Sequence, residues 1–262
     1  MGYINNNTGY LEHHTLSSRS VIKKNMYALI TPDGLVKNNI YGFENCDISI
    51  LSSPLLGASF TDYIITVKEN GRNLCGIGNE SEEIFLFVIE GSLLVYNDNE
   101  KAGLTAGGFF FSPASFKLYF QNNSNNNAKI LLYKRKYKPL NNLSPKTISG
   151  NINNIPYKNF EEMDSVFIKD LLPANDFAYD FNFHILMFKS GAGHGYLETH
   201  IQEHGAYILS GKGMYNLDNK WYGVEKDDYI FMASYCIQGG YCVGKDDFIY
   251  IYSKDCNRDA EL

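Results

Sequence analysis

Hydrophobic positions in this chain fall in short runs of β-branched and aromatic residues that glycine, asparagine and aspartate separate. Residues 84–89 read IFLFVI and residues 248–252 read FIYIY, and 20 tyrosines and 17 phenylalanines contribute to such runs. Runs of this kind, bounded by turn-forming residues, are typical of strands in a sandwich or barrel. The pattern therefore predicts an all-β protein with only a few short helices.

The sequence also repeats itself. When it is shifted by 120 positions without a gap from residue 71 to residue 134, similar residues coincide, as in Gly71 with Gly191, Gly91 with Gly211, Phe111 with Phe231 and Lys134 with Lys254. A fixed offset of this kind indicates one structural unit used twice. We expect an N-terminal unit at 1–150 and a C-terminal unit at 151–262, joined by a connection at 138–155 that contains prolines and asparagines.

Two less regular segments precede the units, at 17–60 and 157–181. The second segment leaves room for a short helix around 160–164. We expect both segments to be arms that pack against the opposite half or against a neighbouring subunit, so the protein is predicted to be a homo-oligomer.

Four potential metal donors lie in the C-terminal unit: Glu198, His200, His204 and Gln238. Residues i and i+2 of an extended strand share a face, so Glu198 and His200 are predicted to point toward one ion. Such a donor set, without thiolate, favours manganese, iron(II) or cobalt over a structural zinc. His194 is predicted to lie at a turn or at the rim of the pocket.

The repeat predicts a single metal in each chain. With the offset of 120, three of the four donor positions carry no plausible ligand in the N-terminal unit, where the counterparts are Gly78, Glu80, Ile84 and Leu118. We therefore expect a filled, apolar interior in the N-terminal unit and the metal in the C-terminal unit.

Charge and composition narrow the classes of partner. The 262 residues carry a formal net charge of −6, and the longest basic tract is residues 134–136, which makes nucleic acid and anionic membranes poor partners. The beginning of the sequence resembles no export leader, and no run of 18 apolar residues occurs. Five cysteines without CxxC spacing indicate reduced thiols. We expect a cytoplasmic protein that acts on a small molecule.

The spacing of the donors resembles the first cupin motif, which runs Gly, spacer, His-x-His, three or four residues, Glu, six residues, Gly. Here the order is Gly195, Glu198-Thr-His200, three residues, His204, six residues, Gly211. The resemblance implies two tandem cupin barrels, a bicupin with a jelly-roll-like fold.

The second cupin motif, Gly-Asp, spacer, Pro-x-Gly-x-x-His, is also altered. The chain has Asp227-Asp228 and then residues 233–238, with Gln238 at the histidine position. Common cupins use three histidines and one glutamate, whereas this chain has Glu, His, His and Gln.

The altered ligand set and five ordered phrases resemble the (S)-ureidoglycine aminohydrolase family over essentially the whole chain. The phrases are LITPDGL at 29–35, GFENCD at 42–47, ETHIQEHGAYILSG at 198–211, MYNLDN at 214–219 and YSKDCNR at 252–258. The resemblance implies a Mn²⁺-dependent enzyme of purine catabolism that converts (S)-ureidoglycine and water to (S)-ureidoglycolate and ammonia. It also implies that substrate contacts come from Glu198, Tyr215, Tyr250 and Lys254.

Strand parity supports part of this set independently. Tyr250, Tyr252 and Lys254 alternate along one predicted strand and so share a face, which leaves open whether Tyr252 also lines the site. A lysine in the interior is costly unless it is paired, and a substrate carboxylate would pair it. Glu198 and Lys254 are the candidates for general acid or base. Lys134, its counterpart in the other unit, leaves open a purely structural role for Lys254.

Two other functions fit the same residues. A metallo-cupin dioxygenase also uses glutamate among its ligands and would consume oxygen. A non-catalytic bicupin would bind a small molecule for storage or sensing and would turn over no ureide.

Overall fold

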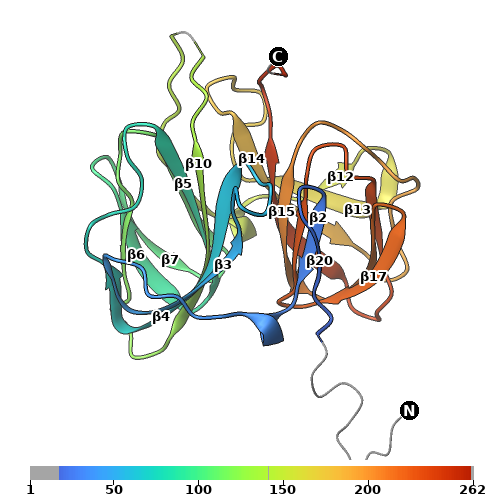
Figure 1. Cartoon of the computed structure of the whole chain (residues 1–262). Coiled ribbons are helices and arrows are strands. Elements are labelled where there is room, and N and C mark those ends of the chain that lie inside the picture. The colour runs from blue at the N-terminus through green and yellow to red at the C-terminus, as the bar shows by residue number, and fades with distance from the viewer. Residues whose placement is uncertain (1–17, 141, 261–262) are drawn as a thin grey trace, which may run out of the picture.

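Twenty strands and two single turns of 3-10 helix form the part of the chain that the computed structural model describes, residues 18–140 and 142–260 (Figure 1). The all-β prediction is confirmed. Residues 1–17, on which the expectation about an export leader rests, lie outside the described residues. The strands of the N-terminal half are β1 (Val21–Lys23), β2 (Tyr27–Ile30), β3 (Phe43–Ser52), β4 (Phe60–Asn73), β5 (Glu82–Glu90), β6 (Ser92–Tyr96), β7 (Lys101–Thr105), β8 (Gly108–Ser112), β9 (Tyr119–Gln121), β10 (Ala128–Lys136) and β11 (Ile148–Asn151).

The C-terminal half continues this pattern. Its strands are β12 (Lys158–Phe160), β13 (Met163–Asp170), β14 (Phe181–Phe188), β15 (His204–Ser210), β16 (Lys212–Leu217), β17 (Lys220–Glu225), β18 (Tyr229–Met232), β19 (Gln238–Cys242) and β20 (Phe248–Asp255), and the 3-10 turns are η1 (Pro32–Gly34) and η2 (Ile152–Asn154). The helix expected around 160–164 is wrong. A tight turn with Glu161 at a positive φ of 52° joins β12 to β13 there instead. No helix in the described ranges is long and apolar enough to cross a membrane.

The strands form two barrels that lie side by side (Figure 1). In the N-terminal half, β3 to β11 belong to one nine-stranded sheet. In the C-terminal half, an eight-stranded sheet in the order β1-β2-β18-β15-β20-β14-β13-β12 accompanies the three-stranded sheet β17-β16-β19. The pocket described below takes its side chains from both C-terminal sheets.

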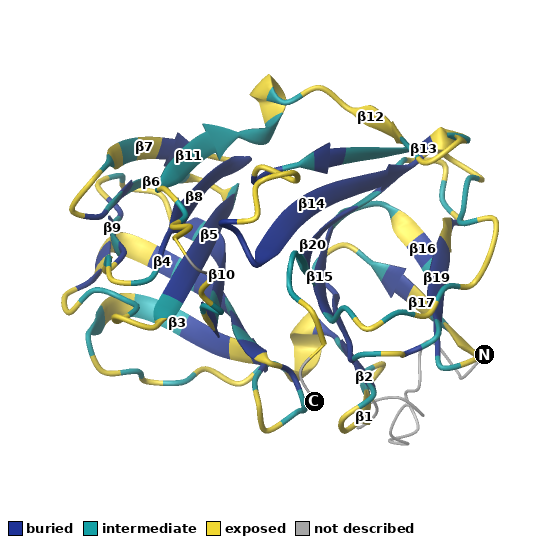
Figure 2. Ribbon diagram, turned by 90° about the horizontal axis from the view of Figure 1, so that it is seen from above, coloured by how far each residue is buried: buried dark blue, intermediate teal, exposed yellow. Residues whose placement is uncertain are grey.

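The barrels meet through a shared aromatic core, to which the buried strands β5 and β14 contribute (Figure 2). Alternate residues of β5 point in opposite directions: Phe85 and Phe87 join the core between the barrels, whereas Leu86 joins the interior of the N-terminal barrel. Phe85 stacks on Phe183 of β14 with ring centroids 4.0 Å apart. Since both faces of β5 are buried, its sequence is a continuous apolar run rather than an alternating one.

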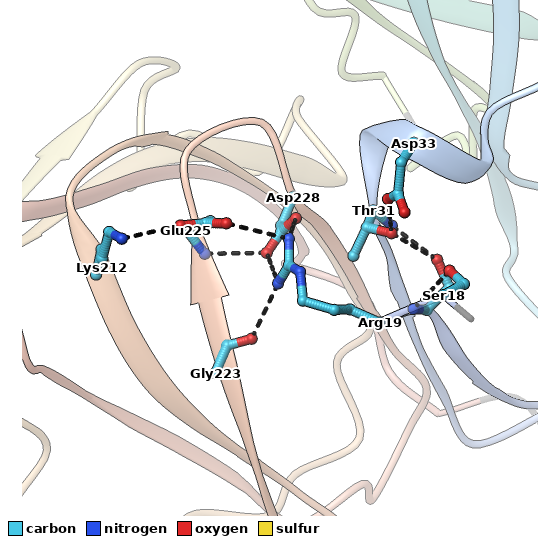
Figure 3. Close-up of polar contacts among 9 residues, drawn as sticks. Ser18, Arg19, Thr31, Asp33, Lys212, Gly223, Glu225 and Asp228 are labelled. Carbon is cyan, nitrogen blue, oxygen red and sulfur yellow. Dashed lines mark hydrogen bonds and ion pairs between the residues drawn. The ribbon is translucent and has the colours of Figure 1, made fainter. Parts of the chain in front are cut away.

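The first arm crosses to the opposite half, one of the two alternatives predicted for it. β2 pairs with β18, so residues 21–30 belong to the C-terminal sheet rather than to the N-terminal unit expected at 1–150. Figure 3 shows Arg19 reaching from this arm to the carboxylate of Asp228, which it binds through two bonds of 3.0 and 2.8 Å. Asp228 is fully buried and also accepts the backbone N–H of Glu225, so it connects the arm to the turn before β18.

Backbone conformations confirm the duplication. Left-handed residues recur 120 positions apart: Gly91 and Gly211 have φ of 79° and 78°, Gly107 and Asp227 have 83° and 74°, and Ser115 and Tyr235 have 80° and 63°. Glycine adopts this conformation without steric cost. The structural positions therefore repeat even where the glycine has been replaced.

The gapless alignment is wrong before residue 84. The paired backbone bonds between Glu198 and Gln238 correspond to those between Ile77 and Leu118, and the bond from Tyr235 N–H to His200 O corresponds to the one from Ser115 N–H to Asn79 O. Hence the offset is 121 in this segment, and the counterparts of Glu198 and His200 are Ile77 and Asn79 rather than Gly78 and Glu80. An extra residue in the loop before Ile84 accounts for the shift.

The interior of the N-terminal barrel is filled as expected. Ile84 and Leu118, which stand where the other barrel has His204 and Gln238, are both 0% exposed within an aliphatic and aromatic cluster. Close packing of this kind fills the place where the C-terminal barrel has its pocket.

Candidate active site

A polar pocket opens in the C-terminal barrel between the two sheets. All four predicted donors line it, as do the predicted substrate contacts. The complete lining is Phe160, Leu186, His194, Glu198, His200, His204, Tyr215, Met232, Gln238, Tyr250, Tyr252 and Lys254. The structure thus brings every predicted site residue into one place.

The donors come from two neighbouring segments of backbone, residues 198–204 and the start of β19. His204 is the first residue of β15 and Gln238 the first residue of β19. Glu198 forms an isolated two-bond bridge with Gln238, with N···O distances of 2.9 and 3.0 Å. The expected strand through Glu198 and His200 is limited to this bridge, and His200 lies in the loop that follows.

Backbone carbonyls fix the tautomers of the two donor histidines. Nδ1 of His200 lies 3.1 Å from the carbonyl oxygen of Gln202, and Nδ1 of His204 lies 2.8 Å from that of Ser253. A carbonyl oxygen only accepts, so each Nδ1 carries the ring proton and each Nε2 presents a lone pair. These two Nε2 atoms are 3.3 Å apart.

The remaining donors face the same point. The side-chain amide nitrogen of Gln238 donates to Nε2 of His200 at 2.9 Å. Oε2 of Glu198 lies 4.0 Å from the same Nε2 of His200. Oε1 of Gln238 is buried and accepts no hydrogen bond from any described residue. Rotation of the amide by half a turn exchanges its oxygen and nitrogen, so an acceptor oxygen can occupy the position facing His200.

Burial keeps the imidazoles neutral. It is the largest cause that lowers the pKa of His200, followed by the cation of Lys254. Burial also lowers the pKa of His204 well below its usual value, with His200 as the next cause. Neutral imidazoles are the form that ligates metals.

Lys254 and the tyrosines form the opposite wall. Tyr250, Tyr252 and Lys254 alternate on β20 and all line the pocket, which answers the question left open for Tyr252. The ring of Tyr215 from β16 meets that of Tyr250 edge-on with centroids 6.0 Å apart. Burial, the leading cause, raises the pKa of all three tyrosines. They remain neutral hydroxyls near pH 7.

Lys254 differs from its counterpart in the other barrel. Lys134 forms an ion pair with Glu82 at 3.9 Å. Lys254 forms no hydrogen bond or ion pair with any residue in the described ranges, so it offers its ammonium group to the pocket.

Two lining residues have sequence signals too weak to assign them. Phe160 ends β12, in the segment where a helix was expected, and no motif marks it as part of the pocket. His194 lies deeper than the predicted rim position, since its Nε2 is buried. In the sequence, only the proximity of His194 to the first cupin motif indicated that it lies near the site.

The two-barrel fold and the ligand pocket in one barrel are those of a bicupin. Oxalate decarboxylase of Bacillus subtilis, at 12% identity, has the same fold with a TM-score of 0.64 over 92% of this chain and 80% of that chain. The crystal structure of protein Ylba from Escherichia coli is closer, with a TM-score of 0.86 and 48% identity over 94% of this chain and 98% of that chain. No family model matches the chain.

Relatives of known activity place the chain more narrowly. It is 51% identical to (S)-ureidoglycine aminohydrolase of Escherichia coli (strain K12) over the full length of both proteins. It is 30% identical to (S)-ureidoglycine aminohydrolase of Arabidopsis thaliana over 92% of this chain and 79% of that protein. The chain belongs to the (S)-ureidoglycine aminohydrolase family of enzymes.

Proposed function

We propose that this protein hydrolyses (S)-ureidoglycine to (S)-ureidoglycolate and ammonia in purine catabolism, with one Mn²⁺ held in the C-terminal barrel. The observation that carries the proposal is the convergence of Glu198, His200, His204 and Gln238 beside Lys254 in one pocket. Full-length similarity to enzymes with this name supports it.

The chemistry of the donors fits a cation. Two lone pairs from neutral imidazoles face each other at 3.3 Å, an arrangement that a shared positive ion stabilises. The buried Oε1 of Gln238 needs a partner, and the carboxylate of Glu198 supplies negative charge. No three His, Cys, Asp or Glu side chains in the described ranges form a metal-binding group by themselves, and the amide of Gln238 adds a donor beside Glu198, His200 and His204. When bound, Mn²⁺ supplies a Lewis acid that polarises and orients the polar groups of the substrate.

Different pocket residues contact different parts of the substrate. Lys254 binds the substrate carboxylate, because its ammonium group is the cation in the pocket lining and has no acidic partner there. Tyr215, Tyr250 and Tyr252 form a wall that excludes water from one face of the central carbon. The substrate is held in one orientation, so water adds to the opposite face and a single enantiomer forms.

Proton transfer accompanies loss of the amine. Glu198 and Lys254 are the acid–base groups within the lining, since the imidazoles are held neutral and the tyrosines stay protonated. The ammonium group of Lys254 donates a proton to the departing amine, and the carboxylate of Glu198 accepts a proton from the attacking water.

The test is ammonia release from freshly generated ureidoglycine under anaerobic conditions, with the metal content measured by mass spectrometry. We expect one manganese per chain, loss of activity with a chelator and recovery when Mn²⁺ is returned. His204→Ala is expected to abolish both metal and activity, whereas Ile84→Ala, the matched truncation in the other barrel, keeps both in the folded fraction. Stereoselective ammonia release by a metal-free variant would contradict the proposal. In a separate aerobic assay, oxygen consumption with an aromatic substrate would indicate a dioxygenase instead.

Location and assembly stay predictions from the sequence. We propose a cytoplasmic homo-oligomer, and sedimentation equilibrium of the purified protein tests the second part.

A further inference from the structure

His194 lines the pocket but belongs to none of the groups assigned above. It lies in a loop whose backbone runs beside β19: its N–H donates to the carbonyl of Gly240 at 2.9 Å, and the neighbouring Gly193 pairs with Tyr241. The imidazole packs edge-on against Phe188 with centroids 5.0 Å apart. These contacts hold the ring in one orientation.

The tautomer of this ring is the reverse of that of the two donor histidines. The backbone N–H of Gly240 donates to Nδ1 of His194 at 3.1 Å. A backbone N–H cannot accept, so Nδ1 carries the lone pair and the single proton of the neutral ring is on Nε2. His194 therefore presents an N–H donor, whereas His200 and His204 present lone pairs.

The donor has no partner in the described part of the chain. Nε2 of His194 is buried, and no hydrogen bond to it is formed there. A buried polar group without a partner is costly, and in a binding pocket the ligand is the natural partner. The donor calls for an acceptor atom.

Positions along β14 identify that acceptor. Lys254 pairs across the sheet with Asn182 of β14, whereas the ring of His194 packs on Phe188, six residues further along that strand. Lys254 and His194 thus serve different regions of the pocket. If the carboxylate of the substrate binds Lys254, the acceptor that remains is the oxygen of the ureido group.

We propose that His194 is a substrate-binding residue whose Nε2–H donates to the ureido oxygen. This assignment rests on the proposed function, because it takes the substrate from it. The assignment explains the bond from the Gly240 N–H to Nδ1 of His194, because this bond keeps the ring proton on Nε2, the side that faces the ligand.

Two substitutions separate the anchor from the donor. In His194→Asn the amide oxygen can take the place of Nδ1 and accept from Gly240, but the donor is lost. In His194→Gln the amide nitrogen can take the place of Nε2, so the donor is kept and the anchor is lost. Binding is measured by calorimetry on the manganese-loaded protein with two stable probes. Hydantoate carries a carboxylate and a ureido group, and guanidinoacetate has nitrogen in place of the ureido oxygen.

We expect His194→Asn to weaken hydantoate binding about tenfold and to leave guanidinoacetate binding within about twofold, the size expected for one hydrogen bond. His194→Gln is expected to keep hydantoate affinity within about threefold. In the ¹⁵N spectrum of the wild-type imidazoles, His194 should show the Nε2–H tautomer, with a shift of Nε2 on addition of hydantoate. This spectrum tests the assignment even if a variant fails to fold.

Unchanged hydantoate affinity in His194→Asn, or an Nδ1–H tautomer in the wild-type protein, would overturn the assignment. Loss of manganese from His194→Asn in proportion to the loss of affinity would also overturn it, since His194 would then act through Glu198. The proposed function fails separately, if the wild-type protein releases no ammonia from ureidoglycine.

Discussion

A buried carboxylic acid between the barrels makes a prediction about stability. Asp62 of β4 is 1% exposed, and the hydroxyl of Tyr229 lies 2.5 Å from its Oδ2. Its other oxygen has no hydrogen-bond partner in the described residues, and the other titratable neighbour is Tyr133, itself fully buried. Burial is the leading cause that raises the pKa of Asp62 to about 7. We predict that Asp62→Asn changes how the stability of the protein depends on pH.

The size of the effect follows from the difference between two pKa values. An aspartate in the unfolded chain titrates near 3.9, so a folded pKa of about 7 corresponds to roughly 4 kcal/mol of preference for the protonated form. The folded state binds the extra proton, so this stability is fully present below about pH 4 and is lost as the pH rises through 7. Asparagine resembles the protonated acid and does not titrate. The mutant should therefore gain about 2.5 kcal/mol relative to wild type between pH 5 and pH 8.

Urea unfolding at intervals from pH 5 to pH 8 measures this difference. Asp98→Asn is the matched control, because Asp98 is exposed in the turn between β6 and β7 and forms none of these contacts. The control should follow wild type, whereas the difference between Asp62→Asn and wild type should grow mainly between pH 5 and pH 7 and level off by pH 8. Parallel curves for Asp62→Asn and wild type would refute the reasoning.

Three further predictions address the arm and the site. Arg19→Ala should lower the free energy of unfolding, measured by urea titration, by about 1–2 kcal/mol, because buried Asp228 loses its cation. The loss is limited to this size because about half of the Arg19 side chain is exposed to solvent. Arg19→Lys should recover part of the loss. Lys254→Met should reduce kcat/KM about 10- to 100-fold, because a charge-assisted hydrogen bond to the substrate is lost. Lys134→Met should leave kcat/KM unchanged. An equal loss of kcat/KM in both variants would point to a structural role for Lys254. Removing the metal with a chelator should lower the melting temperature by about 5–10 °C, with recovery on addition of Mn²⁺; no shift would contradict a metal bound to the folded state.

Residue patterns predicted much of the fold and site because each signal is local. The apolar run at 84–89 identifies a strand whatever its partners are, and the alternation along 250–254 places three side chains on one face. The spacing of Glu198, His200 and His204 resembles a known motif, so their convergence was predicted without a strand between Glu198 and His200.

Features that depend on tertiary pairing were not visible in the sequence. Nothing in residues 21–30 shows that β2 pairs with β18 of the other half. The extra residue before Ile84 is hidden, because the conserved offset on the later strands dominates the self-comparison, and only backbone bonds reveal it. The donor role of His194 depends on the N–H of Gly240, which is 46 residues away in the sequence.

Comparison of the two barrels indicates what turns a shared scaffold into a site. Both barrels keep the left-handed turns and the lysine on the last long strand, so neither feature distinguishes a pocket from a packed core. The difference lies in a few side chains: Ile84 and Leu118 fill one interior, whereas His204 and Gln238 open the other, and Lys134 pairs with Glu82, whereas Lys254 forms no ion pair with any residue in the described ranges. A lysine without its carboxylate is unfavourable in an apolar interior, but in a pocket lined by ligand-binding groups it attracts an anionic substrate. An unpaired Lys254 among the described residues is therefore as much part of the site as the two histidines are.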